Sequence, residues 1–188
     1  MKILGIDPGT ATTGWGLLNV DPGLTGVEGN NGRTKLIVRK FGVINTDKNR
    51  EMHNRLLTLK EGIGKLIKDY QPEIVVVEQI FFGVNSRTAI AIGQARGAIM
   101  LAVAEAQTPI FYQEYTGLTV KLMVAGHGRA DKKQVQESVL KHLGLKELFV
   151  PKNQAGREVF RFRDDAYDAL ALAICHVLKT EGNKVTTP

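Results

Sequence analysis

Acidic side chains stand at the ends of predicted buried elements in three separate parts of the chain. Asp7 follows a short apolar run and precedes a Pro8-Gly9 turn, while Glu78 follows the β-branched run 74–77. Asp165 and Asp168 open the last predicted helix. Carboxylates at element ends are natural ligands for a hard cation such as Mg²⁺ or Mn²⁺, and no His/Cys cluster in the sequence favours a softer metal.

Each of these acids also has an ordinary structural explanation. Asp7 fits an Asx-turn at a hairpin. Asp165 and Asp168, spaced i and i+3, fit capping or interaction with the helix dipole, although Asp168 lies in an otherwise apolar segment. Glu78 is harder to explain, because a buried unpaired carboxylate costs several kcal/mol. It must emerge at the sheet edge, be protonated, or bind a positive group.

The acids would support phosphodiester hydrolysis if they meet in space. With Asp7 bridging two ions, Glu78 on one ion and the Asp165/Asp168 pair on the other, the site would match the two-metal design. In that design one ion activates water and the other stabilises the leaving 3′ oxygen. Basic loops would then hold the phosphate backbone.

The bulk composition is that of a globular domain. The chain has 188 residues, 43% hydrophobic and 23% charged, with net charge +6 and a pI near 9.5. This length predicts one domain over 1–188, with roughly the last eight residues flexible, and the charge favours a polyanionic partner. Cys175 is the single cysteine, which indicates a reducing compartment. With no predicted membrane span, we expect a cytoplasmic protein.

The hydrophobic pattern predicts an α/β fold with a five-stranded mixed sheet and helices on both faces. A first hairpin is followed by a strand, helix and parallel strand, and this unit places ligands beyond the carboxyl ends of its strands. Glycine-rich 21–32 is predicted to be a surface excursion, 127–133 a flexible basic loop and 145–163 a long loop. The expected strands are 1–6, 14–20, 34–44, 74–77 and 110–115, and the expected helices are 49–70, 85–107, 118–125, 134–143 and 164–176.

Four motifs, in this order and spacing, resemble the RuvC family of bacterial Holliday junction resolvases over nearly the whole chain. They are Gly-Ile-Asp-Pro-Gly-Thr at 5–10, Val-Glu-Gln-Ile-Phe at 77–81, Gly-Gln-Ala-Arg-Gly at 93–97 and Asp-Ala-Tyr-Asp-Ala-Leu-Ala at 165–171. The resemblance implies a ribonuclease-H-like fold and a homodimer. It also implies Mg²⁺-dependent, symmetric nicking of four-way DNA junctions in recombination and repair, leaving 5′-phosphate ends that a ligase can seal.

The resemblance also assigns roles to single residues. Asp7, Glu78, Asp165 and Asp168 would be the catalytic acids, holding two Mg²⁺ ions that Mn²⁺ can replace. Phe81 would stack on junction bases, with core filling as the alternative. Lys121 and Lys132 would hold the scissile phosphate, and Arg129 and Lys133 are further DNA-binding candidates in the basic segment. The adjacent acid Asp164 competes with Asp165, and the family motif favours Asp165.

Other implications of the family are not visible in the residues. They are a thymine-containing cleavage sequence and cooperation with the RuvA-RuvB branch-migration complex. The segments 21–32 and 151–163 are longer than the family pattern, so DNA contacts there are not carried over.

Three other functions compete with a junction resolvase. Actin-like or sugar-kinase ATPases also place an Asp and glycines after their first strand, but they need two lobes and a longer chain. A related nuclease could act on RNA. A junction-binding protein with a dead site would bind without Mg²⁺-stimulated nicking, and the presence of all the acids argues against it.

Overall fold

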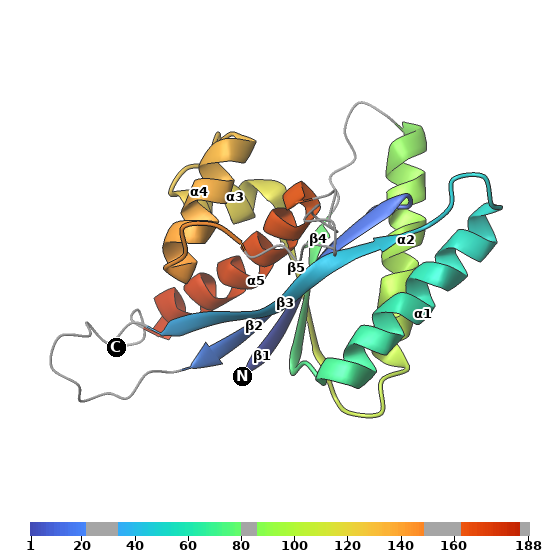
Figure 1. Ribbon diagram of the computed structural model, residues 1–188, viewed down its shortest axis with the longest axis horizontal. Helices are drawn as coiled ribbons and strands as arrows, with labels where there is room; N and C mark the ends of the chain where they lie inside the picture. The colour runs from blue at the N-terminus through green and yellow to red at the C-terminus, as the bar shows by residue number, and fades with distance from the viewer. Residues whose placement is uncertain (22–33, 80–85, 149–162, 185–188) are drawn as a thin grey trace, which may run out of the picture.

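A five-stranded mixed sheet forms the centre of the molecule (Figure 1). The computed structural model describes residues 1–21, 34–79, 86–148 and 163–184. The strand order is β3-β2-β1-β4-β5, in which β1 pairs antiparallel with β2 and parallel with β4. The strands are β1 (Lys2–Asp7), β2 (Thr12–Asp21), β3 (Lys35–Asn45), β4 (Ile74–Gln79) and β5 (Phe111–Thr116).

Helices cover both faces of this sheet. Figure 1 shows α1 and α2 side by side on one face and α3, α4 and α5 on the other. None of the described helices combines the length and apolar composition that a membrane span needs. The helices are α1 (Met52–Tyr70), α2 (Ser86–Ala104), α3 (Gly117–Ala125), α4 (Lys132–Leu143) and α5 (Arg163–Lys184).

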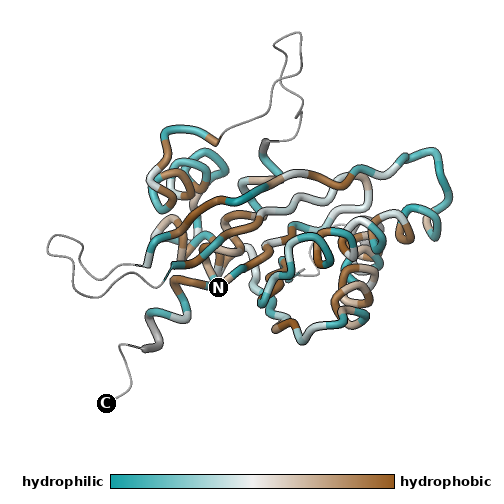
Figure 2. Tube along the Cα trace, turned by 60° about the horizontal axis from the view of Figure 1, so that its bottom comes forward, coloured by the Kyte–Doolittle hydropathy of each residue, from teal (hydrophilic) through white to brown (hydrophobic). Residues whose placement is uncertain are grey.

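The alternation of side chains along the strands builds two separate cores. Ile3 and Val76 point to the face covered by α5, while Leu4 and Val75 point to the face covered by α1 and α2. All four are fully buried. In Figure 2 hydrophobic colour follows the strands and the helices packed on them, whereas the turn from β3 to α1 at the right of the view is hydrophilic. A three-layer α/β sandwich results.

The predicted fold class is confirmed, and the structure corrects several boundaries. The helix expected from residue 49 begins at Met52, and the helix expected to reach residue 107 ends at Ala104. Lys132 and Lys133 do not belong to a flexible loop, because they form the first turn of α4. Asp131 caps that turn in a capping box with Gln134. Phe81 and most of 21–32 and 145–163 lie outside the described residues.

Candidate active site

Asp7 and Glu78 lie side by side at the carboxyl ends of neighbouring parallel strands. Ile6 pairs with Val77, so the next residue of each strand is the acid. Because side chains alternate, Asp7 points to the same face as Ile3, and Glu78 to the same face as Val76. That face is the one covered by α5.

Glycines let the first turns of α5 approach the sheet closely. A Cβ atom added to Gly14 of β2 would lie 2.1 Å from the carbonyl oxygen of Asp165, and one added to Gly5 would lie 2.0 Å from that of Ala169. Gly14 is also the pairing partner of Asp7. The first turn of α5 therefore rests directly on the strand beside Asp7. Glycines inside predicted strands signal such close approach, and Gly5 and Gly14 carry this signal in the sequence.

The carboxylates shift one another's pKa values. Burial raises the pKa of Asp7 to about 7, with further contributions from Glu78 and Asp165. Hydrogen bonding between the Asp7 and Glu78 carboxyl groups also raises the pKa of Asp7 and lowers that of Glu78. Burial also raises the pKa of Glu78, assisted by the charge of Asp168. Burial, followed by the charge of Asp7, raises the pKa of Asp168 to about 6.

Asp164 and Asp165 point to different neighbours. The Asp164 carboxylate accepts a hydrogen bond from Gln136 Nε2 at 2.9 Å and pairs with Lys132 Nζ at 3.2 Å, both on α4. Both residues contribute to the raised pKa of Asp168, whereas only Asp165 of the two contributes to the raised pKa of Asp7. Asp164 thus fastens α4 to α5, while Asp165 belongs to the acid cluster.

Two of the predicted basic residues adjoin the acids. Lys132 Nζ lies 3.8 Å from Asp168 Oδ2, and its charge opposes the raised pKa of Asp7. The charge of Lys121 on α3 opposes the raised pKa of Glu78. Lys133 instead pairs with Glu137 on its own helix, at 3.9 Å. Arg129 is exposed between α3 and α4.

Three of the four acids line two adjoining hollows, and Asp165 lines neither of them. One, of about 710 Å³, is lined by Asp7, Glu78 and Lys121, among others. The other, of about 240 Å³, is lined by Glu78, Lys121, Lys132 and Asp168. Both include Gly117, whose added Cβ would lie 2.7 Å from Glu78 Oε1, so α3 begins directly against this acid.

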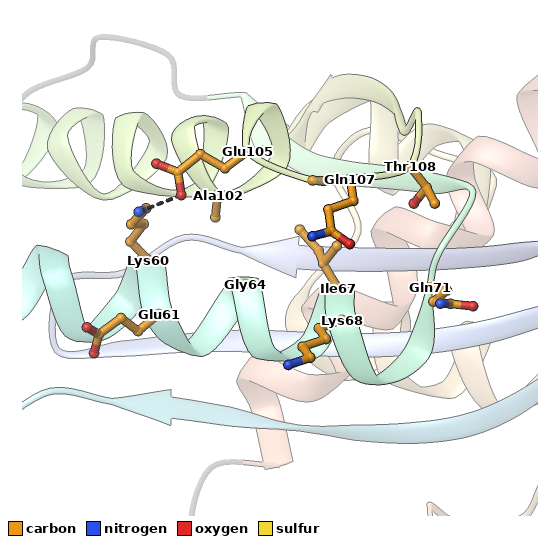
Figure 3. Close-up of a pocket in the computed structure, with 11 residues that line it drawn as sticks. Lys60, Glu61, Gly64, Ile67, Lys68, Gln71, Ala102, Glu105, Gln107 and Thr108 are labelled. Atoms are coloured by element: carbon orange, nitrogen blue, oxygen red, sulfur yellow. Dashed lines mark ion pairs between the residues drawn. The ribbon is translucent and has the colours of Figure 1, made fainter.

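A further hollow of about 340 Å³ lies between the C-terminal halves of α1 and α2 (Figure 3). Lys60 Nζ and Glu105 Oε2 form an ion pair of 2.6 Å across its wall. It contains none of the predicted site residues, and it adjoins the start of β4, at the opposite end of the parallel strands from the acids. Ligands of α/β sheets usually bind at the carboxyl ends of the strands, where the acids lie and this hollow does not.

The acid cluster has the donor chemistry of a hard cation site. All its ligand atoms are carboxylate oxygens, which suit Mg²⁺ or Mn²⁺. Burial, followed by repulsion between the carboxylates, raises the pKa values of Asp7 and Asp168 despite the nearby Lys132, and a bound cation would favour the charged carboxylates. No three His, Cys, Asp or Glu side chains of the described part of the chain are already arranged as a metal cage.

The sequence matches one known protein family over most of its length. The model of the crossover junction endodeoxyribonuclease RuvC family matches residues 3–176. The RuvC of Moorella thermoacetica is 46% identical over 176 residues, covering 94% of this chain and 90% of that protein. That of Chloroflexus aurantiacus is 44% identical, with coverages of 94% and 92%.

Solved structures agree with this match. The structure of T. thermophilus RuvC in complex with Holliday junction substrate superposes with a TM-score of 0.76 at 29% identity, covering 97% of this chain and 96% of that chain. The expected ribonuclease-H-like architecture is confirmed by this neighbour and by the five-stranded sheet. The chain belongs to the RuvC family of crossover junction endodeoxyribonucleases.

Proposed function

We propose that this protein resolves four-way DNA junctions by paired, symmetric, metal-dependent nicks, with Asp7, Glu78, Asp165 and Asp168 as its catalytic acids. The observation that carries the proposal is that Asp7 and Glu78 end neighbouring strands and that the start of α5, which bears the other two acids, packs on β2 beside Asp7. Family membership supplies the substrate class. An ATPase function is disfavoured, because the match to a nuclease family spans nearly the whole chain.

The chain's own residues would perform the following parts of the reaction. The acids would hold two Mg²⁺ ions, with Mn²⁺ as a substitute, and the bound ions would supply water activation and stabilisation of the leaving 3′ oxygen. Lys121 and Lys132, on two helices that flank the acids, would orient the scissile phosphate. Arg129 and Lys133, both exposed, would contact the phosphate backbone further away. Phe81 remains a proposed stacking residue.

Neighbouring acids provide a matched test of the site. Asp165→Asn should abolish Mg²⁺-dependent nicking of a synthetic mobile junction while leaving junction binding intact. Asp164→Asn makes the same substitution at the adjacent residue. It should keep the nicking rate within about tenfold of wild type, because the Asp164 carboxylate faces α4. Equal losses in the two variants would contradict the assignment. Normal nicking by Asp7→Asn would refute the metal-bound site altogether.

Substrate class is tested with the same protein. Rates on junction DNA, linear duplex and structured RNA separate a junction resolvase from an RNA nuclease. Junction binding without nicking, at any concentration of Mg²⁺ or Mn²⁺, would indicate a dead site.

The proposed active form is a homodimer that uses the open face of α2. Ile90 and Leu101 on this face are 62% and 59% exposed. Gly93 and Gly97 lie between them, and added Cβ atoms there would meet no described atom within 4 Å. Beside them an apolar groove of about 400 Å³ runs between α1 and α2. A second copy of this helix is the occupant that fits, because a two-fold dimer matches the approximate two-fold symmetry of a junction.

Sedimentation velocity tests the dimer. Leu101→Asp should yield a monomer, because it places a charge in an apolar contact. Leu145→Asp changes another exposed leucine, after the end of α4, and should leave a dimer. A monomeric wild type, or monomers from both variants, would contradict this interface.

Two further parts of the proposal rest on family membership. The protein would act with the RuvA-RuvB branch-migration complex, and it would work in the cytoplasm, where a single cysteine stays reduced. A pull-down of the two motor proteins on junction DNA, with and without this protein, tests the first part.

A further inference from the structure

Leu118 is a large apolar side chain that is exposed beside the acids. It lies in the first turn of α3, is 66% exposed, and lines the 710 Å³ hollow that also holds Asp7 and Glu78. Isolated apolar residues on a surface need no explanation. An exposed leucine in the wall of a catalytic hollow is different, because it meets whatever enters that hollow.

The position of Leu118 is fixed by its neighbours. Thr116 caps α3 by accepting a hydrogen bond from the backbone N–H of Thr119 at 3.1 Å. Gly117 starts the helix against Glu78. On the other side, a Cβ atom added to Gly128 would lie 2.5 Å from Leu118 Cδ1, so the loop after α3 packs directly on this side chain. Leu118 is therefore held on a rigid helix start beside the acids.

The wall of the hollow combines a cation with apolar groups. Leu118 and Lys121 are spaced i and i+3, so they share one face of α3, and both line the hollow. Ile92 of α2 and Pro8 add apolar surface to the same hollow. A nucleotide offers the complementary pair of groups, a phosphate for the lysine and the apolar faces of a deoxyribose and base for the leucine.

We propose that Leu118 packs against the sugar and base of the nucleotide next to the scissile phosphate and so positions the strand for nicking. This inference rests on the proposed function. It assigns to α3 a contact with the nucleotide itself, in addition to the contact of Lys121 with the phosphate. Leu118 is a positioning residue, and its contribution appears in the rate of nicking more than in the overall affinity for the junction.

The test pairs a protein change with a DNA change. Leu118→Ala should lower the single-turnover nicking rate about tenfold on an intact junction, with the dissociation constant within about twofold of wild type. Two further junctions each carry an abasic nucleotide on one side of the nick. On one of the two, the nicking rates of wild type and Leu118→Ala should become equal, because the base that Leu118 contacts is then missing. Leu118→Met, which keeps an apolar side chain of similar volume, should restore the rate on intact DNA.

Leu122→Ala is the matched control, because Leu122 is 53% exposed on the same helix and is absent from the lining of the hollow. It should nick at the wild-type rate. Wild-type nicking by Leu118→Ala, the same loss on intact and both abasic junctions, or an equal loss in Leu122→Ala would each overturn the inference. Wild-type protein that nicks no junction would instead refute the proposed function, so the two failures are distinguishable.

Discussion

The contact between β2 and the first turn of α5 allows a quantitative prediction for Gly14→Ala. The new Cβ atom would lie 2.1 Å from the Asp165 carbonyl oxygen, whereas real Cβ contacts stay above about 3.0 Å. The obstacle is helix backbone, so α5 must move away from β2 by about 0.9 Å. This displacement carries Asp165 and Asp168 away from Asp7.

A misplacement of about 1 Å in a catalytic constellation can reduce the rate about 100-fold. We therefore expect Gly14→Ala to fold, to bind junctions, and to nick them about 100-fold more slowly, equivalent to about 2.7 kcal/mol in the activation free energy. Single-turnover nicking at saturating Mg²⁺ and urea unfolding measure the two effects separately.

Gly16→Ala is the comparison on the same strand and face. Its Cβ would lie 2.6 Å from Leu170 Cδ2, and this obstacle is a side chain that can change its rotamer. It should therefore cost stability while slowing nicking far less than Gly14→Ala. Nicking by Gly14→Ala within threefold of wild type would show that α5 can yield without disturbing the acids, and would refute the positional reasoning.

Three further predictions follow from the described contacts. Asp7 keeps a proton in the folded state up to a pKa of about 7, against an ordinary 3.8, so the metal-free free energy of unfolding should fall as pH rises from 4 to 7. Asp7→Asn should then be more stable than wild type at pH 8 in EDTA, on the order of 2 kcal/mol by urea unfolding, with little difference at pH 4. Arg96→Ala should lower the free energy of unfolding by about 3 kcal/mol, because it removes the cation that pairs with the Glu114 carboxylate, which is 22% exposed, and leaves the Tyr112 hydroxyl as its described donor. Adding Glu114→Gln to Arg96→Ala should restore much of this loss, and a double-mutant cycle measures the effect. Gly64→Ala, in the interior of α1 with no described atom within 4 Å of the new Cβ, should raise the free energy of unfolding by about 1 kcal/mol in thermal or urea unfolding and leave nicking unchanged.

The sequence alone identified most elements and the neighbourhood of the acids. The apolar run before Asp7 and the β-branched run before Glu78 each predicted a strand that ends at an acid. The structure shows that these strands are parallel neighbours, with Ile6 paired with Val77. Such predictions succeed because the side-chain periods of strands and helices are local properties of the chain. The Thr116 cap of α3 is a local feature of the same kind.

The tertiary structure decided how individual side chains are used. Local sequence cannot separate Asp164 from Asp165, since both fit the start of a helix, and the packing of α4 on α5 turns Asp164 toward Gln136. The same packing sets Lys132 beside Asp168, while Lys133 pairs with Glu137. Leu118 could not be distinguished from a core residue, because the sequence does not show whether a single apolar side chain is buried or exposed. Which neighbour a side chain meets depends on contacts between segments far apart in the chain, and the local periodicity of one segment does not contain that information.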